Sequence, residues 1–174
     1  MKATLIILLV FIALSAIVFG PRVYKDIQKK RNYANTFAIQ NVKTGKCIRV
    51  YNAGIDDGTK IILYSHHNWE CITWQFIQLD DKTFLLKNLY TQKTFEPSSN
   101  PQSETSLWQQ TLGGSSFQYW EFIEQPDKTY LIRLKDTELY VSITSNENNS
   151  PIVLLPKQEI DSQLWRLVRQ NPIF

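Results

Sequence analysis

The sequence repeats itself three times at intervals of 45 or 46 residues, and this repeat constrains the fold more than any other feature. The segment Trp74–Ile77 (WQFI) recurs as Trp120–Ile123 (WEFI) and again as Trp165–Val168 (WRLV). A second pair, Asp81–Phe84 (DKTF) and Asp127–Tyr130 (DKTY), keeps the same spacing. Self-similarity at a fixed period of this length indicates one structural unit that is built several times.

Each copy is divided by turn residues into four short runs with apolar residues at alternating positions. In the first copy these runs are Phe37–Val42, Cys47–Tyr51, Thr59–Ser65 and Thr73–Leu79. Short alternating runs bounded by turn residues are typical of β-strands. The sequence therefore predicts four strands in each copy and an all-β domain.

Three four-stranded units predict a β-trefoil, a six-stranded barrel capped by three hairpins. Its repeats would span residues 37–82, 83–128 and 129–170, within one domain at 37–170. A twelve-stranded sandwich would not require the repeat, and a propeller would need more blades. The expected core consists of one tryptophan from the fourth strand of each repeat and one aromatic residue from each first strand: Trp74, Trp120 and Trp165, with Phe37, Phe84 and Tyr130.

An uncharged apolar segment, residues 4–20, precedes the repeats. At about 1.5 Å per residue it would reach roughly 26 Å as a helix, close to the ~30 Å hydrocarbon core of a bilayer. We expect residues 1–20 to form a hydrophobic helix that serves as an uncleaved signal anchor, so that the protein is a membrane protein. A cleaved signal peptide, which would make the protein secreted, and a buried core helix are the alternatives. Pro21 after Gly20 argues against cleavage at that point.

The charge of the chain is unevenly distributed. Residues 1–36 carry six basic side chains and one acidic side chain, whereas residues 37–174 carry 13 basic and 15 acidic ones. The excess positive charge lies in a basic linker, residues 21–36, where it would meet lipid phosphates. Because the repeat region is mildly acidic, nucleic acid is not an expected partner.

The repeats resemble the ricin-type β-trefoil lectin family. In that family a Q-x-W tripeptide closes each repeat, and this sequence has Gln118–Trp120 and Gln163–Trp165, with Ile72–Trp74 as a degraded version. The family's repeats open with a pattern like sGkCLDV, to which Thr44–Val50 (TGKCIRV) is similar. The resemblance covers nearly all of the chain after residue 36.

The resemblance implies one shallow sugar pocket in each repeat. There, an Asp on the second strand accepts hydrogen bonds from sugar hydroxyls, and an aromatic ring on the third strand stacks on the apolar sugar face. This sequence departs from that pattern at most positions. In repeat order, the Asp position holds Arg49, Glu96 and Ser142, and the stacking position holds Ile62, Trp108 and Val153.

The second repeat is therefore the expected carbohydrate-binding site. It combines Glu96, Trp108 and Gln118, although Phe117 stands where the family has a polar neighbour. The alternative is that Trp108 packs beneath a hairpin and binds nothing.

Two cysteines lie in the first repeat, Cys47 and Cys71, and the resemblance implies a disulfide between them. The match is inexact, since the family's second cysteine falls nearer His66, and two free thiols are equally consistent with the sequence. His66 and His67 lie close to Glu70, but their spacing is not that of a structural zinc site. We expect a solvated loop there, and no metal or cofactor.

Two functions of different kinds are consistent with these residues. The first is a membrane-tethered binding module that recognises a glycan or glycoprotein through the second repeat. The second is a degenerate trefoil that acts as a non-catalytic scaffold for protein partners in a membrane or envelope assembly. The retained Trp108 favours the first, and the loss of every Asp favours the second. We expect no enzyme activity, because the sequence has no nucleophile–base pair, paired catalytic carboxylates or phosphate-binding glycine loop that this fold would organise.

Overall fold

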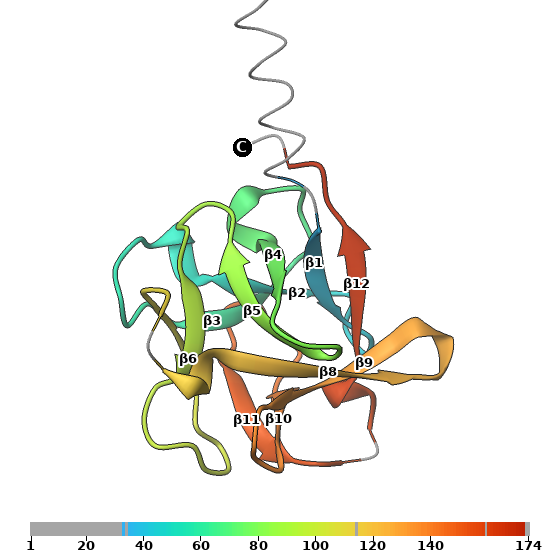
Figure 1. The fold of residues 1–174 in the computed structure, drawn as a ribbon. Coiled ribbons are helices and arrows are strands. Elements are labelled where there is room, and N and C mark those ends of the chain that lie inside the picture. Colours follow the sequence, from blue (N-terminus) through green and yellow to red (C-terminus); the bar gives the residue numbers. More distant parts are fainter. Residues whose placement is uncertain (1–32, 34, 114, 159, 173–174) are drawn as a thin grey trace, which may run out of the picture. The chain divides into compact units, whose positions relative to one another are not determined.

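The structure, a computed structural model, describes residue 33 and residues 35–113, 115–158 and 160–172. Within these residues the regular structure consists of twelve β-strands and five short 3-10 helices (Figure 1). The strands are β1 (Thr36–Asn41), β2 (Cys47–Val50), β3 (Ile61–Tyr64), β4 (Thr73–Gln78), β5 (Thr83–Asn88), β6 (Thr94–Pro97), β7 (Leu107–Gln110), β8 (Tyr119–Gln125), β9 (Thr129–Leu134), β10 (Leu139–Ile143), β11 (Ile152–Pro156) and β12 (Trp165–Arg169). The 3-10 helices are η1 (Tyr51–Ala53), η2 (Glu70–Ile72), η3 (Ser116–Gln118), η4 (Pro126–Lys128) and η5 (Asp161–Gln163).

Among the described residues, six strands close into a barrel, in the order β1–β4–β5–β8–β9–β12 and back to β1. The remaining strands form three hairpins, β2–β3, β6–β7 and β10–β11. Closure leaves no exposed barrel edge. Isolated bridges link the three hairpins to one another in a ring: Lys60 with Trp108, Ile62 with Pro151, and Ser106 with Val153. This is the all-β trefoil architecture that the repeat predicts.

The first and second repeats share a tight turn after their first strand. Gly45 and Gln92 occupy its left-handed position with φ angles of 67° and 59°, and their amides donate to the Asn41 and Asn88 carbonyls. Glycine adopts this left-handed conformation without the steric penalty that a side chain brings. The second repeat therefore keeps the geometry of this turn without the glycine, whereas in the third repeat the positive φ falls two residues earlier, at Asp136.

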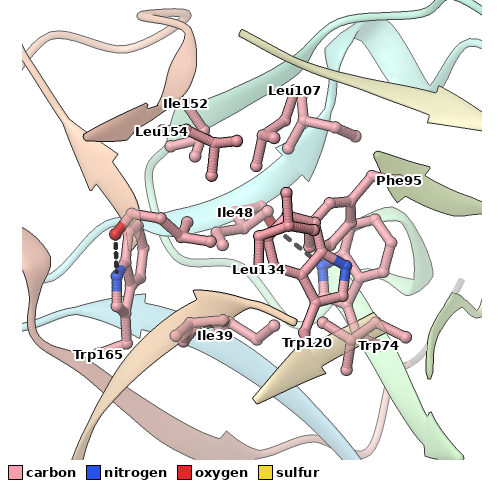
Figure 2. Packing of buried hydrophobic residues seen from close by; sticks show 14 of the residues in the cluster. Ile39, Ile48, Trp74, Phe95, Leu107, Trp120, Leu134, Ile152, Leu154 and Trp165 are labelled. Atoms are coloured by element: carbon pink, nitrogen blue, oxygen red, sulfur yellow. Dashed lines mark hydrogen bonds between the residues drawn. The ribbon is translucent and has the colours of Figure 1, made fainter. Parts of the chain in front are cut away.

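The core is centred on one tryptophan from each repeat. Trp74, Trp120 and Trp165 are each 0% exposed and pack among the buried hydrophobic residues of the core (Figure 2). Two of the three indoles donate a hydrogen bond to the second strand of their own repeat. Trp74 Nε1 donates to the Ile48 carbonyl at 3.2 Å, and Trp165 Nε1 donates to the Val141 carbonyl at 3.0 Å.

The third indole breaks this symmetry. Trp120 Nε1 is buried without a hydrogen-bond partner in the part of the chain that is described. In its repeat the second strand carries Phe95, at the position that Ile48 and Val141 occupy in the other two. The Phe95 ring packs against Trp120 at a centroid distance of 4.9 Å and against Trp74 at 5.0 Å (Figure 2). A large ring thus takes the space beside Trp120 that smaller side chains fill elsewhere.

The aromatic residues on the first strands lie at the margin of the core, which corrects the prediction that they fill it. Phe37, Phe84 and Tyr130 are only partly buried and pack against the main cluster. The central positions belong to the residues two further along each strand, on the same side of the sheet. These are fully buried aliphatic residues: Ile39, Leu86 and Ile132.

Cys47 and Cys71 are free thiols that belong to one small buried cluster with Ala38 and Ile72. Burial raises the pKa of the Cys47 thiol to about 12, because a thiolate would lose its hydration there. The disulfide between the two remains a prediction for an oxidising environment.

We expect Cys47 to resist alkylation in the folded protein. At pH 8 its thiol stays protonated and shielded, and the thiolate is the reactive species. N-ethylmaleimide followed by peptide mass mapping should leave Cys47 unmodified in buffer and label it fully in guanidinium chloride without reductant. Rapid labelling of the native protein would contradict the burial, and protection that persists in denaturant until reductant is added would reveal the disulfide.

Residues 1–32 lie outside the described residues, and with them the predicted hydrophobic helix (1–20) and most of the predicted linker (21–36). In the part of the chain that the structure covers, no helix is both long enough and apolar enough to cross a bilayer. This finding contradicts the membrane localisation expected from the sequence.

Candidate functional site

The three hairpins present the same pair of positions in the same register. The residue at the family's Asp position is paired directly with the residue at the stacking position: Arg49 with Ile62, Glu96 with Trp108, and Ser142 with Val153. Directly opposed residues in an antiparallel pair point to the same side of the sheet, with Cβ atoms about 5 Å apart. In every repeat, the fold therefore places the residue at the family's Asp position beside the residue at the stacking position.

In the second repeat this arrangement brings together the three residues predicted from the sequence. Glu96 on β6 and Trp108 on β7 are both half-buried, and Gln118 at the end of η3 is buried. Gln118 Nε2 donates to Glu96 Oε2 at 2.9 Å. Carboxylate, amide and indole thus form one cluster at the edge of the β6–β7 hairpin.

Gln118 serves to hold Glu96 in place. Besides its bond to Glu96, its Nε2 donates to the Thr111 carbonyl at 3.0 Å, and its Oε1 accepts from the Gly113 amide at 3.0 Å. Both amide hydrogens are therefore engaged inside the protein. Glu96 Oε1, in contrast, has no hydrogen-bond partner among the described residues, so one carboxylate oxygen remains available to a ligand.

The third repeat has the same amide frame without the acid or the ring. Gln163 Nε2 donates to Ser142 Oγ at 2.8 Å and to the Pro156 carbonyl at 2.9 Å, while its Oε1 accepts from the Gln158 amide at 2.7 Å. Val153 is 5% exposed and offers no flat surface. This repeat preserves the scaffold of a site but lacks the groups that would contact a ligand.

The first repeat differs from both. Ile72, which replaces the glutamine, is fully buried, and Arg49 replaces the acid. The guanidinium carbon of Arg49 lies 4.3 Å from the centroid of the Tyr64 ring and 5.3 Å from that of Trp69. Neither aromatic residue was singled out from the sequence, because each lies off the repeat's stacking position.

The histidines near this cluster are engaged with neighbouring side chains. His66 Nε2 lies 2.7 Å from Gln170 Nε2, and the His67 ring stacks on Trp69 at 4.1 Å with an interplanar angle of 12°. Within the described residues, no group of three or more metal-ligating side chains comes together.

The six-stranded barrel, the three hairpins and the repeated amide frame define a β-trefoil of the lectin type. A family model described as "Ricin-type beta-trefoil lectin domain-like" matches residues 26–100 and 70–155. The chain belongs to this family, which confirms the resemblance seen in its repeats. Among curated proteins, none matches the chain.

Solved structures support the same fold. A designed threefold-symmetric protein, ThreeFoil, superposes with a TM-score of 0.74 at 20% identity, over 77% of this chain and 98% of its own. The Macrolepiota procera ricin B-like lectin in complex with lactose gives 0.67 at 20% identity, over 77% and 94%. A Clostridium thermocellum exo-β-1,3-galactanase gives 0.74 at 18% identity, over 78% of this chain and 30% of its own. At these identities the likeness establishes the fold.

Proposed function

We propose that this protein is a non-catalytic carbohydrate-binding module whose second repeat holds the saccharide. The observation that carries the proposal is the cross-strand pair of Glu96 and Trp108, with Gln118 hydrogen-bonded to the carboxylate. Membership of a lectin family, and a structural neighbour solved with lactose, support it further.

Each residue has a distinct role in the proposed site. Trp108 would stack on the C–H face of a sugar ring, and Glu96 Oε1 would accept hydrogen bonds from hydroxyl groups. Gln118 is a positioning residue that fixes the carboxylate in one orientation. The exposed ring of Phe117, on η3 beside Gln118, adds apolar surface instead of a polar partner. One stacked ring and one carboxylate are expected to give an affinity of about 1 mM for a monosaccharide.

One carboxyl group near the proposed site is poorly suited to glycosidase chemistry. A glycosidase needs a carboxyl group with a raised pKa to protonate the leaving oxygen. Asp57 lies in the loop before Lys60, the residue that bridges to Trp108. A hydrogen bond from Lys93 lowers the pKa of Asp57, and Lys93 Nζ lies 2.7 Å from Asp57 Oδ1. Because a lowered pKa keeps Asp57 ionised, it is unsuited to act as a proton donor.

Replacing Trp108 with alanine is expected to abolish saccharide binding with only a modest loss of stability, because the ring is half-buried. A glycan array identifies the saccharide, and titration calorimetry with that saccharide compares the variants. Glu96→Gln should weaken binding, because the neutral amide is a poorer acceptor for sugar hydroxyls. Tyr90→Ala, which removes an exposed ring in the β5–β6 turn, is the matched control and should bind normally.

Two results would contradict this proposal. One is an array on which the protein binds no saccharide at all. The other is a Trp108→Ala variant that is destabilised by several kcal/mol, which would assign Trp108 to the core. Either result would favour the alternative of a trefoil that acts as a protein scaffold.

A further inference from the structure

The first repeat presents a positively charged group at the position where the second presents an acid. Arg49 lies on β2, opposite Ile62, as Glu96 lies on β6 opposite Trp108. Its side chain is half-buried, and within the described residues it forms no ion pair. The first repeat thus has Ile72 in place of the glutamine, and it also has a positive charge, Arg49, where the second repeat has a negative one.

Aromatic rings fix the orientation of this guanidinium. Arg49 lies over the Tyr64 ring and near the Trp69 ring. The centroids of these two rings are 6.4 Å apart, and His67 stacks on Trp69. A cation–π contact uses the face of the guanidinium and leaves its N–H groups, which lie in its plane, without partners. The contact therefore orients the hydrogen-bond donors without consuming them.

The hydrogen-bonding capacity of Arg49 is indeed unused. Its Nε is buried and has no partner in the part of the chain that is described. A buried donor without a partner is costly, and a charged one is more so. The terminal Nη1 and Nη2 groups are not among the buried atoms and also have no partner among the described residues, so an incoming oxyanion could accept from them. Arginine recognises carboxylate and sulfate oxygens with two parallel hydrogen bonds.

We infer that the first repeat holds a second binding site, for an acidic saccharide that carries a carboxylate or a sulfate ester. Arg49 binds the oxyanion, and the rings of Tyr64 and Trp69, whose faces contact Arg49 and His67, hold the guanidinium in place beside the sugar. The inference rests on the proposed function in taking saccharides as the ligand class. It concerns a different repeat and the opposite ligand charge, so the two can fail separately.

The test compares pairs of probes that differ in one charged group. The full-length protein, labelled with ¹⁵N, is titrated with methyl β-glucuronide against methyl β-glucoside, and with galactose 6-sulfate against galactose. We expect at least one acidic probe to bind about tenfold more tightly than its neutral counterpart, through charge-assisted hydrogen bonds. That probe should also shift the indole N–H signal of Trp69.

Variants identify the group responsible. Arg49→Gln should reduce the affinity for the acidic probe to that for the neutral one, and Arg49→Lys, which keeps the charge but loses the paired donors, should fall between. Lys157→Gln, which removes an exposed charge in the third repeat, is the matched control and should bind normally. Trp108→Ala should also retain the acidic probe.

Specific results would overturn the inference. These are equal affinity for acidic and neutral probes, unchanged binding by Arg49→Gln, or loss of the acidic probe in Trp108→Ala. Inorganic sulfate that binds as tightly as galactose 6-sulfate would reduce the site to a simple ion site. If Arg49→Gln fails to fold, the test rests on the wild-type protein. There, a Trp69 indole N–H signal that shifts with neither acidic probe excludes the site.

Discussion

Replacing Trp165 with alanine is expected to lower the free energy of unfolding by about 3–5 kcal/mol, the usual range for a buried tryptophan. The side chain is fully buried at the centre of the barrel, and its indole donates to the Val141 carbonyl. Alanine would leave a cavity and a buried carbonyl oxygen without its partner. Chemical denaturation monitored by circular dichroism measures the difference, and Trp74→Ala should behave in the same way.

The three tryptophans can also be told apart by substitution with phenylalanine. Trp74→Phe and Trp165→Phe each remove a buried hydrogen bond, whereas Trp120 makes none with the described residues. We therefore expect Trp120→Phe to be less destabilising than the other two by about 1 kcal/mol. Equal losses for all three would contradict the asymmetry that Phe95 introduces. Near-zero losses for two of the alanine variants would contradict the trefoil register itself.

The architecture could be predicted because the repeat carries it. A strand period of two and a tryptophan at the same place in each copy are local properties of the sequence. The runs predicted in the first copy begin and end within two residues of β1, β2, β3 and β4. The register of the hairpins followed as well, since the pairs Arg49–Ile62, Glu96–Trp108 and Ser142–Val153 align as the repeat requires.

Packing across repeats could not be predicted in the same way. Alternation indicates which face a residue occupies, but not its depth in a barrel, so Phe37 was placed in the core that Ile39 occupies. The loss of the Trp120 hydrogen bond depends on the bulk of Phe95, a neighbour brought close by the fold rather than by the sequence.

The candidate sites show the same limit. Gln118 was recognised by its tripeptide, but its role depends on contacts with Thr111 and Gly113 that the tripeptide does not encode. The cluster of Arg49, Tyr64 and Trp69 went unrecognised, because its members come from two strands and a loop and follow no repeat. The one sequence signal for this cluster is Arg49 itself, a basic residue at the family's Asp position.

A buried ion pair between the second and third repeats gives the other large expected effect. Glu121 on β8 is 6% exposed and lies directly opposite Arg133 on β9. Arg133 Nε and Nη2 lie 2.7 Å and 2.6 Å from Glu121 Oε2, and Lys82 Nζ lies 3.6 Å from Oε1. Hydrogen bonding to Glu121 raises the pKa of Arg133, because the adjacent carboxylate favours the charged guanidinium.

Arg133→Met is expected to lower the free energy of unfolding by about 3 kcal/mol, because it leaves the Glu121 carboxylate buried with a single, more distant cation. The double variant Arg133→Met/Glu121→Met should recover most of the loss, since the cost arises from an unpaired charge and not from missing attraction. Glu138→Gln is the control. Glu138 contacts Arg133 Nη1 at 3.0 Å, but its side chain is 81% exposed, so we expect a change within about 0.5 kcal/mol. If the double variant is as unstable as Arg133→Met, the loss reflects packing of the arginine stem rather than the unpaired Glu121 charge.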